Sequence, residues 1–128
     1  MYRFLFFILL LLNGCSNSDQ QSVKIISSSE FIGLSDDFEL IDVRTKSEYE
    51  SGFIESALNI DFFSATFESD VLSLNKNSKI ILYCRTNNRS TKTANLLKKN
   101  GFKDISVIEG GITDWVKNGN YIVYPKLD

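Results

Sequence analysis

Histidine is absent from this sequence of 128 residues, and cysteine occurs only twice, as Cys15 and Cys84. Without histidine, the chain lacks the most common general base and the most common metal ligand of proteins. Two cysteines are too few for a structural zinc site, and these two do not form a Cys-x-x-Cys redox pair. We therefore expect no metal and no cofactor.

A strong charge of one sign is also missing. The net charge is −2, which gives no basic field for collecting nucleic acid, so we expect no nucleic-acid partner. Hydrophobic residues make up 43% and charged residues 23%, a balance typical of a globular domain rather than a disordered chain. The length leaves room for one domain.

The first 15 residues have the pattern of an export signal. Arg3 precedes an apolar run from Phe4 to Leu12, which at nine residues is far shorter than the ~20 residues of a membrane-spanning helix. The ending Leu12-Asn13-Gly14-Cys15 resembles the bacterial lipobox, which implies cleavage before Cys15 and lipidation of its thiol. A plain secretory signal that leaves Cys15 as a free thiol is the alternative.

The lipoprotein interpretation divides the chain into three parts. We expect a signal peptide at residues 1–14, a polar lipid-anchored tether at 15–22 and a folded domain at 23–128. The protein would then be exported and anchored to a membrane, on its periplasmic or other extracytoplasmic face. Cys84 would be the one free thiol of the mature chain, so it could form no internal disulfide.

Short apolar, β-branched runs alternate with segments of helical pattern along the rest of the chain. This alternation predicts an α/β domain with a mostly parallel sheet, in which ligands bind at the carboxyl ends of strands. That rule points to the loops after Val43 and Tyr83. The predicted strands are Val23–Ile26, Glu39–Val43, Lys79–Tyr83 and Ile105–Ile108, and the predicted helices are Ser28–Leu34, Ser47–Ser51, Phe62–Leu72, Ser90–Asn100 and Ile112–Asn118.

The loop after Tyr83 holds the residues with the clearest chemistry. Cys84 ends the strand, and a short polar loop then opens a helix, whose unpaired N–H groups and partial positive charge favour the nucleophilic thiolate. Two of the three arginines after the signal segment, Arg85 and Arg89, lie in this loop, and the planar fork of arginine suits an oxyanion. The alternative is a core cysteine at a strand end beside two solvated arginines.

The sequence Cys84-Arg85-Thr86-Asn87-Asn88-Arg89-Ser90 resembles the active-site loop of rhodanese domains, in which Cys-Arg-Thr-Gly-Asn-Arg-Ser is a frequent form. Two more motifs are similar to that family and stand in the right order. The resemblance runs from about Val23 to the C-terminus and implies a rhodanese-like fold, a five-stranded parallel sheet with helices on both faces. The further motifs are Asp42-Val43-Arg44 with Glu48-Tyr49, Gly52, Ile54, Ala57 and Asn59-Ile60, and Gly110-Gly111 with Trp115.

The resemblance also implies roles for these residues. Cys84 would accept a sulfane sulfur as a persulfide, stabilised by the backbone N–H groups of Arg85 through Arg89, so that fixed dipoles replace a general base. Arg89 and Arg85 would bind a small anionic sulfur donor such as thiosulfate, while a thiol, cyanide or a protein would accept the sulfur. The other loop residues assigned to the site are Thr86, Asn87, Asn88 and Ser90, and Asp42 and Arg44 would brace the loop rather than react.

Three positions depart from the family pattern. Phe53 stands where the family usually has histidine, Ser56 where it usually has glycine, and Asn87 replaces a loop glycine. If the Asn87 position requires a positive φ, asparagine is the least costly replacement for glycine. We expect Phe102 and Trp115 to be core residues rather than parts of a cofactor site.

Two other functions compete with sulfur transfer. Phosphatases and arsenate reductases on the related fold place five residues between cysteine and arginine, whereas four, Arg85 to Asn88, separate Cys84 from Arg89. The tighter loop fits a single sulfur atom better than a tetrahedral phosphate. A non-catalytic domain that binds a partner, or carries a persulfide to one, would use the same Cys84 and therefore stays open.

Overall fold

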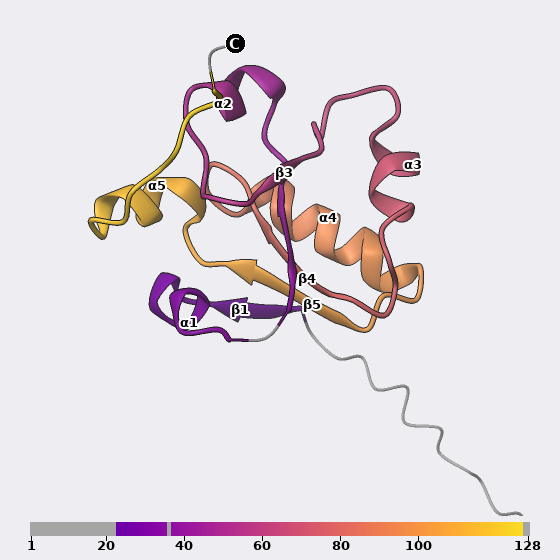
Figure 1. Ribbon diagram of the computed structural model, residues 1–128. Helices are drawn as coiled ribbons and strands as arrows, with labels where there is room; N and C mark the ends of the chain where they lie inside the picture. The colour runs from indigo at the N-terminus through magenta and orange to yellow at the C-terminus, as the bar shows by residue number, and fades with distance from the viewer. Residues whose placement is uncertain (1–22, 36, 127–128) are drawn as a thin grey trace, which may run out of the picture.

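The computed structural model describes residues 23–35 and 37–126 (Figure 1). The predicted signal peptide, the tether and Cys15 lie outside the described residues. None of the helices in the described ranges is long and apolar enough to cross a membrane.

Five parallel strands form one sheet, as the rhodanese resemblance implied, and their order in the sheet is β1-β5-β4-β2-β3. The register places Ile41 opposite Leu82, and Leu82 opposite Val107. The central strands are continuous apolar runs because helices cover both faces of a sheet of this kind. The strands are β1 (Lys24–Ile26), β2 (Glu39–Asp42), β3 (Leu58–Asn59), β4 (Lys79–Tyr83) and β5 (Asp104–Ile108).

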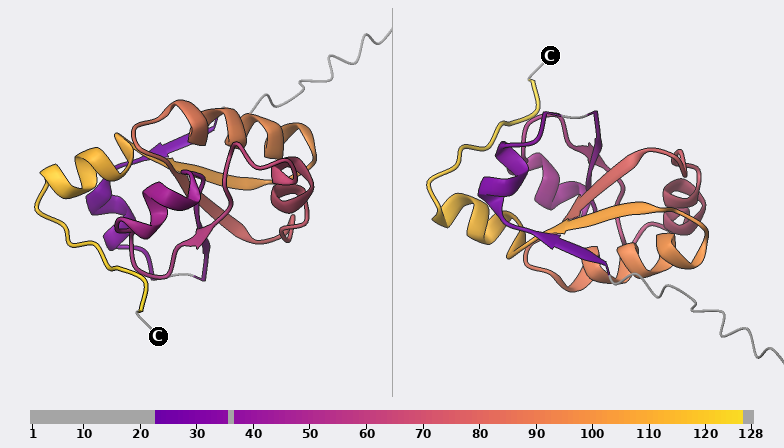
Figure 2. Two further views of the ribbon diagram at one scale, coloured as in Figure 1. Left: turned by 90° about the horizontal axis from the view of Figure 1, so that it is seen from above. Right: turned by 90° about the horizontal axis from the view of Figure 1, so that it is seen from below.

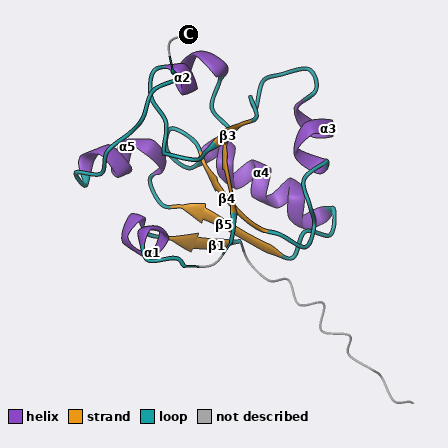
Figure 3. Ribbon diagram, viewed as in Figure 1, coloured by secondary structure: helices purple, strands orange, loops and turns teal. Residues whose placement is uncertain are grey.

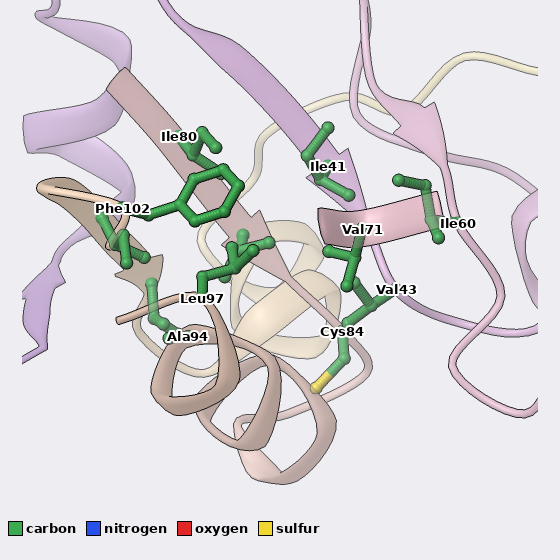
Figure 4. Close-up of a cluster of buried hydrophobic side chains, with 12 residues drawn as sticks. Ile41, Val43, Ile60, Val71, Ile80, Cys84, Ala94, Leu97 and Phe102 are labelled. Carbon is green, nitrogen blue, oxygen red and sulfur yellow. The ribbon is translucent and has the colours of Figure 1, made fainter. Parts of the chain in front are cut away.

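Helices cover both faces of the sheet, which confirms the predicted architecture (Figures 2 and 3). On one face, Ile80 of β4 packs in a cluster with Val71 of α3 and Leu97 of α4 (Figure 4). On the other face, Tyr83 packs in a second cluster with residues of α1 and α5, among them Trp115. The helices are α1 (Ser28–Ile32), α2 (Lys46–Glu50), α3 (Phe67–Leu72), α4 (Asn88–Lys99) and α5 (Gly111–Lys117).

All five helices differ from their predicted bounds, and two of them begin two or more residues away from the predicted start. The helix predicted at Ser90–Asn100 begins two residues earlier, at Asn88. The helix predicted at Phe62–Leu72 begins only at Phe67, because the preceding residues form a turn whose Asp61 carboxylate accepts a hydrogen bond from the Phe63 backbone N–H at 2.8 Å. Phe102 and Trp115 are buried in the core, as predicted.

Candidate active site

A pocket of about 610 Å³ opens at the carboxyl ends of β2 and β4, where the sequence predicted a ligand site. It brings together most of the predicted loop residues with three residues that the sequence analysis gave no role in binding. Its lining consists of Thr45, Glu48, Phe63, Cys84, Arg85, Thr86, Asn88 and Arg89. Asn87, Ser90, Asp42 and Arg44 do not line the pocket and act on it through their contacts.

Cys84 lies at the floor of this pocket with only 1% of its surface exposed. Figure 4 shows its side chain at the end of the core cluster, with the sulfur directed toward α4. The Sγ atom lies 3.3 Å from the hydroxyl oxygen of the buried Ser90, which is also 3.2 Å from the carbonyl oxygen of Asn87. The Ser90 hydroxyl can therefore donate to either the sulfur or the loop backbone.

The backbone of the loop presents donors rather than acceptors to the site. Within the described ranges, the structure records no acceptor for the backbone N–H groups of Arg85 through Ser90. The carbonyls of Cys84 and Arg85, in contrast, accept hydrogen bonds from Ile112 and Thr113 at 3.0 and 3.1 Å. The N–H groups of α5 thus hold the loop through the carbonyls of Cys84 and Arg85. The loop N–H groups before and at the start of α4 stay without an acceptor, and together they form a nest suited to an anion.

The Gly110-Gly111 pair lets α5 approach the loop this closely. Gly111 has φ +56, and a Cβ there would lie 2.4 Å from the carbonyl oxygens of both Cys84 and Thr86. No other residue fits this approach without moving the loop backbone. The motif that resembled a C-terminal signature of the family therefore positions the site.

Asn87 ties the loop to the turn between β5 and α5. Its Nδ2 donates to the carbonyl of Ile108 at 3.3 Å, and its Oδ1 accepts from the backbone N–H of Gly110 at 2.9 Å. Asn87 has φ −136, so the positive φ considered for this position is not there. Asparagine therefore contributes side-chain hydrogen bonds at this position rather than backbone freedom.

Arg89 forms a bidentate ion pair with Glu48. Its Nη1 and Nη2 donate to the Glu48 carboxylate at 2.6 and 2.9 Å, while the backbone N–H and hydroxyl of Thr45 donate to the same carboxylate at 2.9 and 3.0 Å. Hydrogen bonds from Arg89, and then those from Thr45, lower the pKa of Glu48 from 4.5 to about 2, against an opposing effect of burial. The same pair raises the pKa of Arg89.

Asp42 and Arg44 form a buried ion pair that contacts the backbone of the pocket-lining residue Glu48. The Arg44 guanidinium donates to both carboxylate oxygens of Asp42, at distances from 2.6 to 3.0 Å. It also donates to the carbonyls of Glu48 at 3.1 Å and Gly52 at 2.7 Å, which fixes α2 and the turn after it. The pair therefore braces α2, which carries Glu48, and among the described residues it makes no hydrogen bond or ion pair with the loop of residues 84–90.

Three residues of the pocket lining were not predicted from the sequence to bind a ligand. Thr45 and Glu48 do carry a local signal, because Thr-x-x-Glu is the pattern of a helix capping box, which the structure contains. That pattern says nothing of the contact between Glu48 and Arg89, 41 residues apart. Phe63 has no local signal, since its place in the pocket depends on the turn that precedes α3.

The rhodanese-like domain family matches residues 27–118 of the sequence. This chain belongs to the rhodanese-like family. Solved structures agree with its fold. A rhodanese-related protein from Thermoplasma volcanium has a TM-score of 0.72 at 24% identity over 80% of this chain and 99% of that one. A rhodanese-like domain protein from Staphylococcus aureus has a TM-score of 0.69 at 29% identity over 81% of this chain and 100% of that one.

Curated relatives place this rhodanese-like domain within both short and long proteins. A tRNA uridine(34) hydroxylase from Wigglesworthia glossinidia brevipalpis is 32% identical over 121 residues, which are 86% of this chain but 38% of the hydroxylase. The chain covers 27% of the same kind of protein from Buchnera aphidicola. The uncharacterized protein YqhL from Bacillus subtilis (strain 168) is 32% identical over 96 residues, 75% of each chain.

Proposed function

We propose that this rhodanese-like domain is a sulfurtransferase that moves a sulfane sulfur from an anionic donor, such as thiosulfate, to a thiol or cyanide through a persulfide on Cys84. The observation that carries the proposal is the buried Cys84 sulfur at the pocket floor, beside a loop whose backbone N–H groups have no acceptor in the described ranges. Such a site stabilises a charged sulfur without a general base.

The reaction follows two balanced steps. The Cys84 thiolate attacks the outer sulfur of thiosulfate, the bond between the two sulfurs breaks, and sulfite leaves with its electron pair. The acceptor thiolate or cyanide then attacks the outer sulfur of the persulfide, and Cys84 leaves as a thiolate. Two successive half-reactions through one covalent intermediate give ping-pong kinetics.

The other residues of the site support these steps. The N–H groups of Arg85 through Ser90 offset the negative charge of the persulfide, and the Ser90 hydroxyl, 3.3 Å from the sulfur, adds a further donor. The guanidinium groups of Arg85 and Arg89 attract the anionic donor. Asp42 and Arg44 act indirectly. They hold α2 in place and so position Glu48, the ion-pair partner of Arg89.

We propose sulfur transfer rather than the reaction of the tRNA uridine(34) hydroxylases. The chain covers 38% of the first of those relatives, and its net charge of −2 gives no general attraction for RNA. Sulfur transfer needs only Cys84 and the groups of the loop that surrounds it.

The test is to follow sulfur on the protein itself. We expect the full chain carrying Cys15→Ser, in which Cys84 is the only thiol, to gain one sulfur atom from thiosulfate by intact-mass measurement and lose it on adding cyanide. The same chain with Cys84→Ser should gain none. Turnover of thiosulfate by the Cys84→Ser chain, or no sulfur uptake by Cys84 from any sulfane donor, would refute the assignment.

We also propose that Cys15 carries a lipid that anchors the protein to a membrane. The support is in the sequence alone, in the apolar run up to Leu12 and the Gly14-Cys15 pair that follows Asn13.

A further inference from the structure

Lysine side chains gather at the end of the sheet opposite the active-site pocket. All the strands are parallel, so their amino ends lie together, and the C-terminal end of α4 lies beside the start of β5 at the same edge (Figure 1). Apart from the half-buried Lys98, these lysines are exposed. We call this surface the basic patch, and it consists of Lys76, Lys98, Lys99, Lys103 and the carboxylate of Asp104.

Contacts between neighbouring segments bring the residues of the basic patch together. The ammonium group of Lys76, in the turn before β4, lies 5.9 Å from the ring centroid of Phe102. The other three lysines belong to the segment that runs through Phe102, two at the end of α4 and one directly after that ring. Four lysines and one carboxylate give the patch a net charge of +3, while the whole chain has −2, so the rest of the chain carries −5.

The proposed lipid anchor joins the domain beside the basic patch. Val23, the first described residue, packs against the core cluster that contains Phe102. The register pairs Lys24 with Ser106, so β1 begins next to the start of β5. The segment from Cys15 to residue 22 spans at most about 29 Å when fully extended. A lipid on Cys15 therefore keeps this end of the sheet close to the bilayer surface.

The distribution of charge favours one orientation of a domain held in this way. Anionic lipid headgroups attract clustered lysines within a Debye length of about 8–10 Å, and they repel the acidic remainder of the domain. The tether raises the local concentration of the patch at the surface. The pocket of Cys84 lies at the carboxyl ends of β2 and β4, so contact through the patch leaves it open to solution.

We propose that the basic patch docks onto the anionic phospholipid headgroups of the membrane that holds the protein, and so directs the pocket of Cys84 away from that membrane. This inference rests on the lipid attachment at Cys15 proposed above and adds an interaction surface to it. It is independent of the sulfur transfer reaction.

Lysine labelling shows which face of the domain lies on the membrane. The protein, purified with its acyl groups, is added to vesicles of phosphatidylcholine alone or of phosphatidylcholine with phosphatidylglycerol. A neutral acylating reagent then modifies the accessible lysines, and peptide mass spectrometry gives a labelling rate for each of them. A neutral reagent is used because a charged one would itself be repelled or attracted by the anionic vesicles.

We expect phosphatidylglycerol to slow the labelling of the patch lysines roughly three- to tenfold, because the patch then spends most of its time on the headgroups. The difference should vanish at an ionic strength of about 1 M, where the Debye length is about 3 Å. Exposed lysines elsewhere on the domain should keep their rates, and they are Lys46, Lys117 and Lys126.

Two triple Lys→Gln variants with the same change in net charge test the patch itself. One alters Lys76, Lys99 and Lys103, and the matched control alters Lys46, Lys117 and Lys126. We expect the first variant to lose the protection of Lys98, which stays in place as the reporter, and the control to keep it.

Two failures can be told apart. Equal labelling of the patch in both kinds of vesicle, or slower labelling of the control lysines instead, would overturn the docking and leave the anchor standing. An intact mass without acyl groups would refute the anchor, and the docking would fall with it.

Discussion

Glu48 connects two parts of the site at the scale of single residues. Its carboxylate caps the N-terminus of α2 by accepting a hydrogen bond from the Thr45 backbone N–H. The same carboxylate accepts two hydrogen bonds from the guanidinium of Arg89, at the start of α4. Its backbone carbonyl accepts from Arg44, which the buried Asp42 orients. One side chain thus sets both the position of a helix and the charge that the pocket presents.

The lowered pKa of Glu48 makes a prediction about pH. With a folded-state pKa of about 2 against an ordinary 4.5, the pair stabilises the fold fully above pH 4.5, and this stabilisation is lost as pH falls through about 2. We expect Glu48→Gln to lower the free energy of unfolding by about 1 kcal/mol at neutral pH, because the pair is partly exposed and screened. Urea denaturation of both chains at pH about 7, 5 and 3 should give a constant difference at the first two and a smaller one at the third.

Asn87 provides a second test at this scale. We expect Asn87→Gly, although it restores the residue frequent in the family, to destabilise the fold by about 1–2 kcal/mol, because two side-chain hydrogen bonds to the β5–α5 turn are lost. Asn87→Asp keeps the acceptor for Gly110 and should lose less. Thermal denaturation measures both, and a Gly variant as stable as the wild type would show that these two bonds do not govern the position.

Single residues differ in how far the sequence reveals them. The residues from Cys84 to Ser90 could be predicted because they are contiguous and their chemistry is local. The Glu48–Arg89 pair could not, because 41 residues separate its members and only the sheet order brings them together. Ser56 has a positive φ of 68, which gives a physical reason for the glycine usual at its position in the family.

At the scale of elements, the alternation of apolar runs and helical patterns predicted the order of strands and helices along the chain. The residues at which these elements begin and end depended on tertiary contacts and could not be predicted as well. β3 has two residues, Leu58–Asn59, too few for a periodic pattern to register. Its place at the sheet edge is fixed by its pairing with β2 and by Asn59, whose side chain donates to the carbonyls of Asp42 and Arg44 at 3.0 Å each. The fifth strand was therefore predicted by the family resemblance and not by the pattern of its own residues.

The junction between β5 and α5 gives the prediction at this scale. We expect Gly111→Ala to destabilise the fold by about 3 kcal/mol or more and to abolish sulfur uptake, because a Cβ there meets the Cys84 and Thr86 carbonyls at 2.4 Å. Gly119→Ala is the matched control, since Gly119 has φ +82 with nothing within 4 Å. It should cost about 1 kcal/mol and leave uptake intact.

Chemical denaturation and intact-mass measurement on the same samples separate the two variants. Equal losses of stability and activity in Gly111→Ala and Gly119→Ala would mean that positive φ alone matters at Gly111, and that the contact between α5 and the loop does not position the site.

At the scale of the whole molecule, the proposed anchor determines where the domain works. We expect Cys15→Ser to release the protein from the membrane fraction, or to leave its precursor uncut, because the lipid is attached to that thiol. Membrane fractionation with a carbonate wash, followed by intact-mass measurement, compares the variant with the wild type. Cys84→Ser should fractionate normally, and retention of Cys15→Ser in the washed membranes would exclude lipid attachment at this residue.

The order of the sheet has a consequence for how the chain is made. β1 pairs only with β5, so Lys24 lies opposite Ser106 and the first strand finds its partner last. During synthesis, residues 24–26 emerge without a neighbour until nearly the whole domain has left the ribosome, because long-range pairing of this kind closes late. A chain that cannot complete its sheet early stays open to threading through a translocation pore, which is compatible with the export that the proposed anchor requires.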